Sequence, residues 1–283
     1  MEENFGMKIL TIANNKGGVG KTTTTVNLAE AFGRMDYRVL VIDLDPQGNA
    51  SLVIGDRHPS QVPCTAAELL LRNDVAVISE AIQLNTRMDN VSLIFGDIER
   101  MSSIEDDIRQ KSLQPAQLLS LKLRALKGAF DIILIDTPPA LGMLTANALA
   151  ASTDYIVPLL SGDQFGLYGM TNLDKLVTRI KDINPGLTLA GALLVQYDNR
   201  QSICKVTANT TRERFPRVFT TTTSRATAVQ QSVAVKMSVI ALDPNNKVAR
   251  EYRALAKEIL AQWGVQPEAK SGEQQGSSVE IAS

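Results

Sequence analysis

Two lysines and two threonines stand in one short glycine-rich stretch near the start of the chain. Successive glycines let the backbone turn tightly, so that several N–H groups can point at one anion. A lysine ammonium adds a point charge to such a site, and a threonine hydroxyl is an oxygen ligand for Mg²⁺. The pattern therefore predicts a loop that binds the phosphates of a nucleotide together with a metal ion. The residues expected to bind the nucleotide are Lys16, Gly17, Gly18, Val19, Gly20, Lys21, Thr22 and Thr23.

Three aspartates could complete this site. Asp43 ends an apolar run at 38–43, Asp45 follows it by two residues, and Asp136 ends a second run at 131–136. In a doubly wound sheet, ligands bind beyond the carboxyl ends of the strands, so these side chains are expected to converge on the glycine-rich loop. Carboxylates suit the hard, oxygen-seeking Mg²⁺ ion, and Asp136 is the acid expected to hold it.

The loop lies between the two elements that are needed to position it. Residues 7–13 form an apolar run typical of a buried strand, and an apolar pattern at helical spacing extends from Thr22 to about Met35. A strand, a glycine-rich turn and a helix in this order make a phosphate-loop match credible. The start of the helix would add unsatisfied N–H groups and the positive end of the helix dipole.

The rest of the chain alternates between short apolar runs and helical patterns. Continuous β-branched runs bounded by charges are typical of parallel strands buried on both faces. The order predicts an α/β fold with a mostly parallel, doubly wound sheet and helices on both faces. Further strands are predicted at 38–43, 91–95, 131–136, 155–159, 187–195 and 218–220, and helices at 65–71, 75–82, 98–127 (started or broken at Pro115), 168–183, 204–215 and 246–263.

The length of the chain suits one large domain. A chain of 283 residues with a hydrophobic fraction of 44% is ordinary for an α/β domain with a sizeable core. We predict a single domain over residues 7–263, preceded by an extension at 1–6. Residues 264–283 are rich in Gly, Ser, Gln and Glu, which predicts a disordered tail. With so few residues before the first strand, an N-terminal helix-turn-helix is not expected.

Composition indicates a cytoplasmic protein without a membrane anchor. No apolar run reaches the roughly 18–20 residues needed to span a bilayer. The start of the chain is acidic, with Glu2 and Glu3, and lacks the basic region of a secretory signal. Cys64 and Cys204 lie far apart and form no metal-binding pair, which predicts two free thiols.

Charge is unevenly distributed along the chain. The net charge is −1, yet residues 197–260 contain 11 Lys/Arg and 5 Asp/Glu, a local balance of +6. This balance favours an anionic partner for the C-terminal quarter. Helices with solvated charged faces explain it equally well.

The glycine-rich loop resembles the deviant Walker A loop of the ParA/MinD ATPases, a group of P-loop NTPases that also includes the nitrogenase iron protein. The first glycine of the common motif is Asn15 here, and a second lysine, Lys16, stands near the start of the loop. Segments 43–49 and 136–142 resemble the Walker A′ segment and the Walker B and switch II segments of ParA-type partition ATPases. The likeness extends over about residues 7–262 and includes 147–149 and 198–200.

The resemblance implies an enzyme that couples ATP hydrolysis to dimerisation. In the family, two protomers enclose ATP with Mg²⁺, and the deviant lysine, here Lys16, reaches the phosphates bound by the partner. Asp45 matches the residue that orients the attacking water, and Asp43 supports the Mg²⁺ shell. Turnover is slow until an adaptor on the cargo, such as a ParB-like protein, stimulates it. The catalytic residues implied are Lys16, Lys21 and Asp45, and the metal site implied comprises Thr22, Asp43 and Asp136.

The ATP-bound dimer of this family binds DNA without sequence preference. This property implies a nucleoid-associated protein that positions a plasmid, a chromosome origin or a protein organelle. Phosphate contacts need only well-placed cations. Residues 224–227 depart from the Pro-Arg-Asn-Val of close relatives, which leaves the adenine contacts open. Arg200 and Arg225 lie near the DNA-contacting arginines of relatives, and looser candidates are Lys205, Lys236, Lys247 and Arg250.

Other functions of the same fold remain as alternatives. A MinD-like membrane-cycling ATPase would need a lysine-rich C-terminal amphipathic helix, whereas the chain after Val265 is mostly polar and the pattern at 246–263 favours packing on the sheet. An electron-transfer iron protein would need cluster-ligating cysteines at the dimer interface, whereas the chain has only Cys64 and Cys204, and neither is near Asp136. A metabolic or synthetase-type P-loop enzyme and a DNA-binding module without ATPase activity are the further alternatives.

Overall fold

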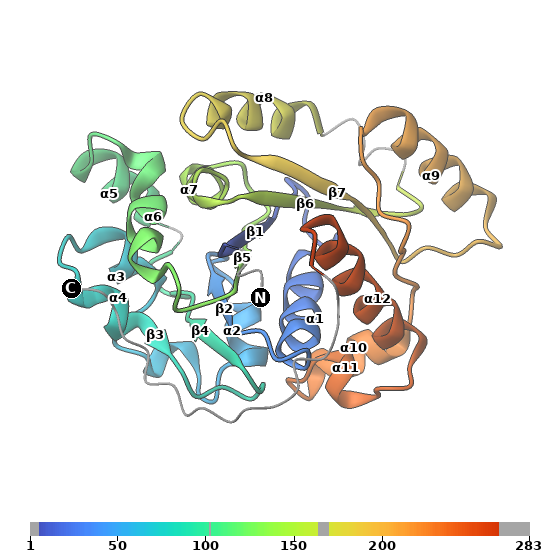
Figure 1. The fold of residues 1–283 in the computed structure, drawn as a ribbon, viewed down its shortest axis with the longest axis horizontal. Coiled ribbons are helices and arrows are strands. Elements are labelled where there is room, and N and C mark those ends of the chain that lie inside the picture. The colour runs from blue at the N-terminus through green and yellow to red at the C-terminus, as the bar shows by residue number, and fades with distance from the viewer. Residues whose placement is uncertain (1–5, 102, 164–169, 266–283) are drawn as a thin grey trace.

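In the computed structural model, which describes residues 6–101, 103–163 and 170–265, a seven-stranded sheet forms the centre of the fold. The strand order is β3-β4-β2-β5-β1-β6-β7, and among the described strands only β3 is antiparallel to its neighbour (Figure 1). The connections diverge at β1: the chain passes from β1 to β2 on one side and from β5 over β1 to β6 on the other. Ligands bind at such a switch point. The strands are β1 (Lys8–Ile12), β2 (Val39–Asp43), β3 (Ile82–Gln83), β4 (Val91–Ile94), β5 (Ile132–Asp136), β6 (Asp154–Leu160) and β7 (Thr188–Val195).

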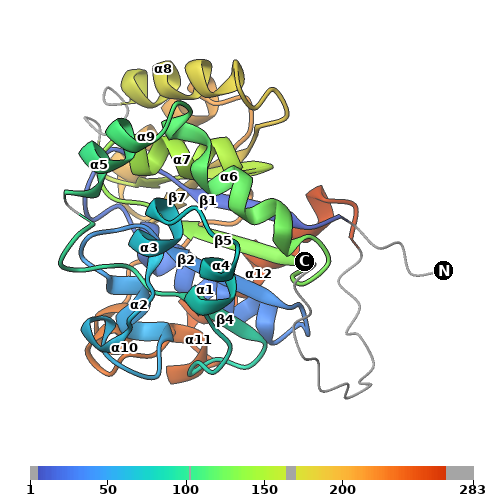
Figure 2. The ribbon, with the colours of Figure 1, turned by 90° about the vertical axis from the view of Figure 1, so that its left-hand side faces the viewer.

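Helices cover both faces of the sheet. They are α1 (Lys21–Gly33), α2 (Asn49–Ile54), α3 (Ala66–Leu71), α4 (Ala76–Ala81), α5 (Ile104–Lys111), α6 (Leu118–Leu123), α7 (Met143–Ala151), α8 (Met170–Lys181), α9 (Ser202–Arg214), α10 (Thr227–Ala234), α11 (Val239–Leu242) and α12 (Lys247–Gln262). Alternate residues of β5 face opposite sides: Ile132 and Leu134 pack with α1 and α12, whereas Ile133 and Ile135 pack with α3 to α7. Figure 2 shows α10 and α11 on one side of the sheet and α8 and α9 on the other. The predicted α/β fold is confirmed.

The helical region predicted at 98–127 is broken into shorter pieces. It contains α5, α6 and two 3₁₀ turns, at Pro115–Gln117 and Arg124–Leu126. Pro115 begins the first of these turns because proline has no N–H to donate and is tolerated only in the first turn of a helix. Asn147 of α7 holds this break in place, since its Nδ2 donates to the Pro115 carbonyl oxygen at 2.7 Å.

Several elements have no counterpart among the sequence predictions, namely α2, α7, α10, α11 and β3. In α7, Leu144 and Leu149 pack into different core clusters, so the helix is buried on more than one side and its apolar residues show no helical period. The strand predicted at 218–220 is wrong. Val218 forms a single bridge to Ala192, and a Cβ placed on Gly191 would lie 2.9 Å from the ring of Phe219.

The amphipathic helix α12 packs its apolar face into the core, as predicted. Tyr252, Leu255 and Ile259 are buried there beside α1. Just after the helix, the Trp263 ring stacks on Phe32 of α1, with ring centroids 6.2 Å apart. The apolar face of α12 is therefore used within the protomer.

Three further predictions concern the thiols, the termini and the membrane. Cys64 and Cys204 are free and buried. Residues 1–5 of the predicted extension, residues 266–283 of the predicted tail, and the first two residues of the helix predicted at 168–183 lie outside the described part. In the part of the chain that the structure describes, no helix is long and apolar enough to cross a membrane.

Candidate functional site

The glycine-rich loop connects β1 to α1 at the carboxyl edge of the sheet. Gly18 and Gly20 have φ values of 73° and 81°, left-handed conformations that glycine adopts without a Cβ clash. Asn14 anchors the loop, because its Nδ2 donates to the Pro158 carbonyl oxygen at 2.7 Å and its Oδ1 accepts from the Lys16 N–H at 2.9 Å. The loop is thus held by β6 as well as by its own strand.

The two lysines of the loop lie in different environments. Lys21 is 6% exposed, and its ammonium donates to the Lys16 carbonyl oxygen at 2.9 Å. Burial lowers the pKa of Lys21, while the carboxylates of Asp136 and Asp45 oppose that shift. The Lys16 side chain is 46% exposed and forms an ion pair with Asp163, which follows β6. One ammonium is therefore enclosed by the loop and the other is accessible from outside.

Two aspartates meet where β2 and β5 end. Asp43 and Asp136 are register partners on these neighbouring strands, and both are fully buried. The Asp136 carboxylate accepts hydrogen bonds from the hydroxyls of Thr22 at 2.7 Å and Thr25 at 3.1 Å. The structure therefore brings together Thr22 and Asp136, two of the three residues predicted for the Mg²⁺ site, and places Asp43 beside Asp136.

Asp43 is held by the segment that follows it. Its Oδ2 accepts from the Ser51 N–H at 2.8 Å and the Ser51 hydroxyl at 2.7 Å, and its Oδ1 accepts from the Asp45 N–H at 3.1 Å. A Cβ on Gly96 would lie 3.1 Å from the Asp43 Cγ, so the backbone closes over this carboxylate. Asp45 itself is 6% exposed and accepts from the Gln47 N–H at 2.9 Å. Both carboxylate oxygens of Asp43 thus accept hydrogen bonds from the protein. This arrangement suits the predicted role of Asp43, which is to support the groups around Mg²⁺.

The buried carboxylates are electrostatically unfavourable without a cation. Burial raises the pKa of Asp136, and the neighbouring Asp43 carboxylate raises it further. Burial also raises the pKa of Asp43, although hydrogen bonds from Ser51 oppose the shift. Among the described residues, no group of three or more His, Cys, Asp or Glu side chains is arranged to hold a metal ion. Mg²⁺ needs only one or two carboxylates beside phosphate oxygens and water, so the Thr22 hydroxyl and the Asp136 carboxylate fit this ion.

Four residues of this site are absent from the sequence predictions: Asn14, Thr25, Ser51 and Asp163. Thr25 has a signal in the sequence, since it follows Thr22 by three residues and side chains at that spacing share a helix face. Asp163 also has a signal in the sequence, because it is an acidic residue that follows a predicted strand, like the other acids of the site. Asn14 and Ser51 have no such signal, since only the fold sets their partners.

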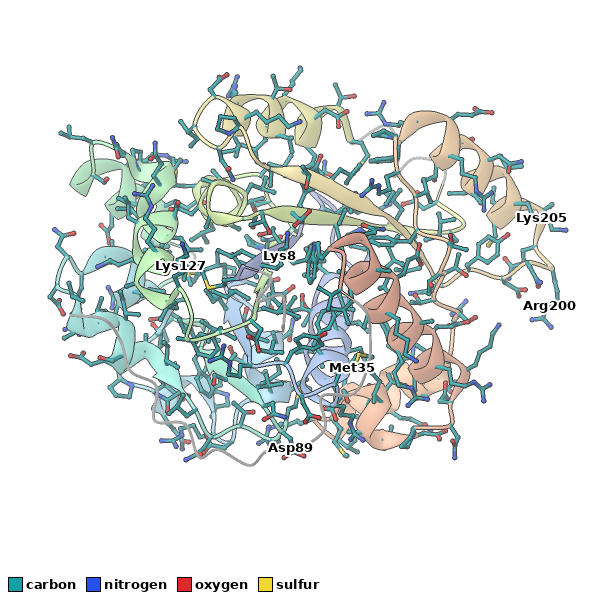
Figure 3. All side chains as sticks on the ribbon, viewed as in Figure 1. Lys8, Met35, Asp89, Lys127, Arg200 and Lys205 are labelled. Atoms are coloured by element: carbon teal, nitrogen blue, oxygen red, sulfur yellow. The ribbon has the colours of Figure 1, made fainter. Side chains whose placement is uncertain are left out.

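The six residues predicted to contact DNA are all exposed. Arg200, just before α9, and Lys205, within α9, lie at one margin of the molecule (Figure 3). Lys236 follows α10, and Lys247 and Arg250 lie in the first turn of α12. Five of the six therefore lie in, or within two residues of, helices α9, α10 and α12.

Arg225, the sixth, lies in a pocket beside the phosphate loop. A Cβ on Gly20 would lie 3.8 Å from Val195 at the end of β7, so the loop packs against this strand end. Gln196 comes next in the chain and lines the pocket, whose volume is roughly 490 Å³. Arg225 and Gln196 therefore line one pocket, close to the strand end on which the loop packs. The lining residues are Gln196, Ser224, Arg225, Ala226, Thr227, Val229 and Gln230.

Comparisons with known proteins decide the family. A family model described as an AAA domain matches residues 7–189. The chromosome partitioning protein ParA of Caulobacter vibrioides is 32% identical over 258 residues, which cover 90% of this chain and 94% of that protein. The sporulation initiation inhibitor protein Soj of Bacillus subtilis is 33% identical over 259 residues, which cover 90% and 98% of the two chains. The chain belongs to the ParA/MinD family. The predicted ParA-type membership is confirmed, and the chain is an ATPase.

One solved structure with a similar fold has the name of a different kind of enzyme. The cobyrinic acid a,c-diamide synthase of Mycobacterium smegmatis, crystallised with ADP and magnesium, has a TM-score of 0.77 at 30% identity and covers 91% of this chain and 96% of its own. Its name is that of a synthase, whereas the two relatives above are named for partitioning and for sporulation. The ParA-type fold therefore does not by itself distinguish a synthetase-type enzyme from a partition ATPase.

Replacing Asp136 with asparagine is expected to stabilise the protein in the absence of nucleotide and Mg²⁺. Because its folded-state pKa is raised, the stability that this group contributes is lost as the pH rises through that pKa. At pH 8, Asp136→Asn should increase the free energy of unfolding by about 1–3 kcal/mol. Urea unfolding should show that this gain in the free energy of unfolding becomes smaller as the pH is lowered towards 5. Asp106→Asn, an exposed acid on α5, is the control, and a variant less stable than wild type at pH 8 contradicts the prediction.

Proposed function

We propose that this ParA-type ATPase is a nucleotide-dependent switch that assembles on DNA. Two copies bind ATP and Mg²⁺ and form a dimer, the dimer binds DNA without sequence preference, and an adaptor on a cargo stimulates hydrolysis and release. The contrast between the two loop lysines carries this proposal. Lys21 is buried over its own loop, whereas Lys16 is half exposed, which suits a cation that serves a second protomer.

The loop and the start of α1 bind the phosphates in this proposal. The backbone N–H groups of residues 17–20 face the anion, and the positive end of the α1 dipole adds to their attraction. Lys21 contributes a charge that is already desolvated. Thr22 and Thr23 stand in the first turn of α1, where their N–H groups have no partner within the helix.

The acids hold the metal ion and the attacking water in this proposal. Thr22 and Asp136 hold Mg²⁺, because they supply oxygens already in contact with each other. Asp43 positions the neighbouring groups, and Asp45 orients the water. Lys16 must leave Asp163 before it can reach the phosphates bound by the partner, so their ion pair opposes assembly until nucleotide is bound.

The charge of the C-terminal quarter supports DNA binding. Residues 197–260 carry a local excess of +6. The Arg200 side chain is 85% exposed and forms an ion pair with Asp198 at 2.9 Å, which lowers the pKa of that carboxyl group. An exposed pair of this kind is only weakly stabilising because solvent screens it, so a DNA phosphate can replace the carboxylate.

The cargo, the adaptor and the location are proposed by class. Caulobacter ParA is named for chromosome partitioning, which supports DNA or a DNA-linked assembly as the cargo. We place the protein in the cytoplasm, on the nucleoid. A MinD-like membrane cycle has less support, because α12 buries its apolar face and the chain after Val265 is mostly polar.

Binding to two labelled DNA duplexes of unrelated sequence tests the proposal. Fluorescence anisotropy should show binding only with ATP and Mg²⁺, with equal affinity for both duplexes, and the affinity should fall as salt rises. Arg200→Glu should weaken binding by about tenfold, because it reverses one phosphate contact. Light scattering should show the ATP-dependent dimer both in the wild type and in Arg200→Glu.

Arg57→Glu is the matched control for this experiment. Arg57 is also exposed and also pairs with a neighbouring carboxylate, that of Asp56, at 2.9 Å. Its charge reversal should leave the DNA affinity within about twofold of wild type, since Arg57 lies outside the C-terminal quarter. Absence of DNA binding with ATP would favour the synthetase-type alternative, and binding to anionic vesicles instead would favour the membrane cycle.

A further inference from the structure

A second pocket lies between the phosphate loop, the segment after β5, and helix α8. Its volume is roughly 470 Å³. Asn15 belongs to the phosphate loop, and residues 139–141 begin three positions after Asp136. The pocket, called here the α8 groove, thus touches both segments that carry the nucleotide site. Its lining residues are Asn15, Pro139, Ala140, Leu141, Asn172, Lys175, Leu176 and Arg179.

One face of α8 forms a wall of this groove. Asn172, Lys175, Leu176 and Arg179 are spaced at i, i+3, i+4 and i+7, so they share one side of the helix. The buried side of α8 consists of other residues: Met170, Leu173, Val177 and Ile180. Lys175 and Arg179 are exposed, whereas Leu176 is half buried. The groove face is therefore separate from the face that packs α8 on the sheet.

The two cations of the groove have no acidic partner among the described residues. The side chains of Lys175 and Arg179 form no ion pair or hydrogen bond there. Asp174, the acid on the same helix, pairs instead with Arg214. Like charges four residues apart on a helix repel each other. A carboxylate from a partner would remove that repulsion.

The remaining surface of the groove is apolar. Pro139 and Ala140 are exposed, and Leu141 and Leu176 are half buried. Apolar area of this kind is covered favourably by apolar side chains of a partner. Duplex DNA offers one negative charge about every 1.7 Å and would leave this apolar area unused. The combination of two cations and an apolar floor therefore favours a protein segment over DNA.

We propose that the α8 groove docks an acidic amphipathic segment of the adaptor protein, with carboxylates on Lys175 and Arg179 and apolar side chains on the floor. This inference rests on the proposed function, in which an adaptor stimulates hydrolysis. A segment seated there touches the phosphate loop at Asn15 and the chain that leads from Asp136 to α7. The adaptor can thereby act on the nucleotide site without entering it.

Fluorescence anisotropy with a designed peptide tests the groove. The probe is a fluorescein-labelled peptide of repeated Leu-Glu-Glu-Leu-Leu-Glu-Glu heptads, compared with the same peptide carrying lysine in place of glutamate. Both are titrated with the nucleotide-free protein. The acidic peptide should bind and the basic peptide should not. The double variant Lys175→Glu/Arg179→Glu should weaken binding at least about tenfold, because both carboxylate contacts become repulsive.

Lys181→Glu is the matched control on the same helix. Lys181 is exposed in the last turn of α8, as Arg179 is, but does not line the groove. Its reversal should leave peptide affinity unchanged. No binding of the acidic peptide, an equal loss in Lys181→Glu, or displacement of the peptide by duplex DNA overturns the inference. Because the titration needs no ATP, a failure of ATP-driven dimerisation would instead count against the proposed function.

Discussion

Lys21→Ala is expected to abolish ATP binding, with a loss of affinity of at least about 100-fold. Lys21 is 6% exposed, and its ammonium donates a hydrogen bond to the Lys16 carbonyl oxygen. Its charge is held in a site from which water is largely excluded, so its attraction for phosphate is strong. Alanine leaves the loop N–H groups in place but removes that charge. Titration calorimetry with ATP and Mg²⁺ measures the loss.

The fold of the Lys21→Ala variant should be retained. Burial already disfavours the charged form of this lysine, as its lowered pKa shows. Removing the ammonium should therefore leave the thermal unfolding temperature of the nucleotide-free protein equal or higher. Lys127→Ala, which changes an exposed lysine after α6, is the control for both measurements. Unchanged ATP affinity in Lys21→Ala would remove this lysine from the nucleotide site.

Lys16→Gln is expected to separate nucleotide binding from dimerisation. The Lys16 side chain is half exposed and pairs with Asp163, so it makes no enclosed contact with its own loop. ATP affinity should therefore stay within about threefold of wild type, while ATP-driven dimerisation and hydrolysis fall at least about tenfold. Light scattering with ATP and Mg²⁺ measures the dimer, and phosphate release measures hydrolysis.

Arg34, a cationic residue whose side chain is about as exposed as that of Lys16, provides the control. The Arg34 side chain is 49% exposed and pairs with Glu30 on α1. Arg34→Gln removes a similar charge and a similar ion pair, and both dimerisation and hydrolysis should remain as in wild type. If Lys16→Gln dimerises normally, a role for Lys16 in the partner's site is excluded.

Arg225 has a second possible role besides DNA binding. Its place in the sequence matched DNA-contacting arginines, but the pocket beside the phosphate loop includes it together with Gln196. In Arg225→Glu, a loss of both DNA binding and ATP-driven dimerisation would therefore indicate a role for Arg225 beside the nucleotide. Arg200, which is 85% exposed beside α9, is the better probe of DNA binding.

The strands and the phosphate loop could be predicted from the sequence because their causes are local. The apolar run that ends at Asp136 and the two left-handed glycines, Gly18 and Gly20, depend on side-chain type and on neighbouring residues. The same holds for the apolar stripe of α12. Local prediction failed for α7, which is buried on more than one side, and for 218–220, where Phe219 covers Gly191 instead of extending a strand.

The sequence by itself determined the fold class, the phosphate loop and the acids at the strand ends, because these follow from period, turn chemistry and residue type. Only the tertiary structure decided which groups touch. It placed Asn14 on Pro158 of β6, paired Lys16 with Asp163, and assembled the α8 groove from three separate segments. Such contacts join residues far apart in the chain, so they depend on how the layers pack and leave no periodic signal along the sequence.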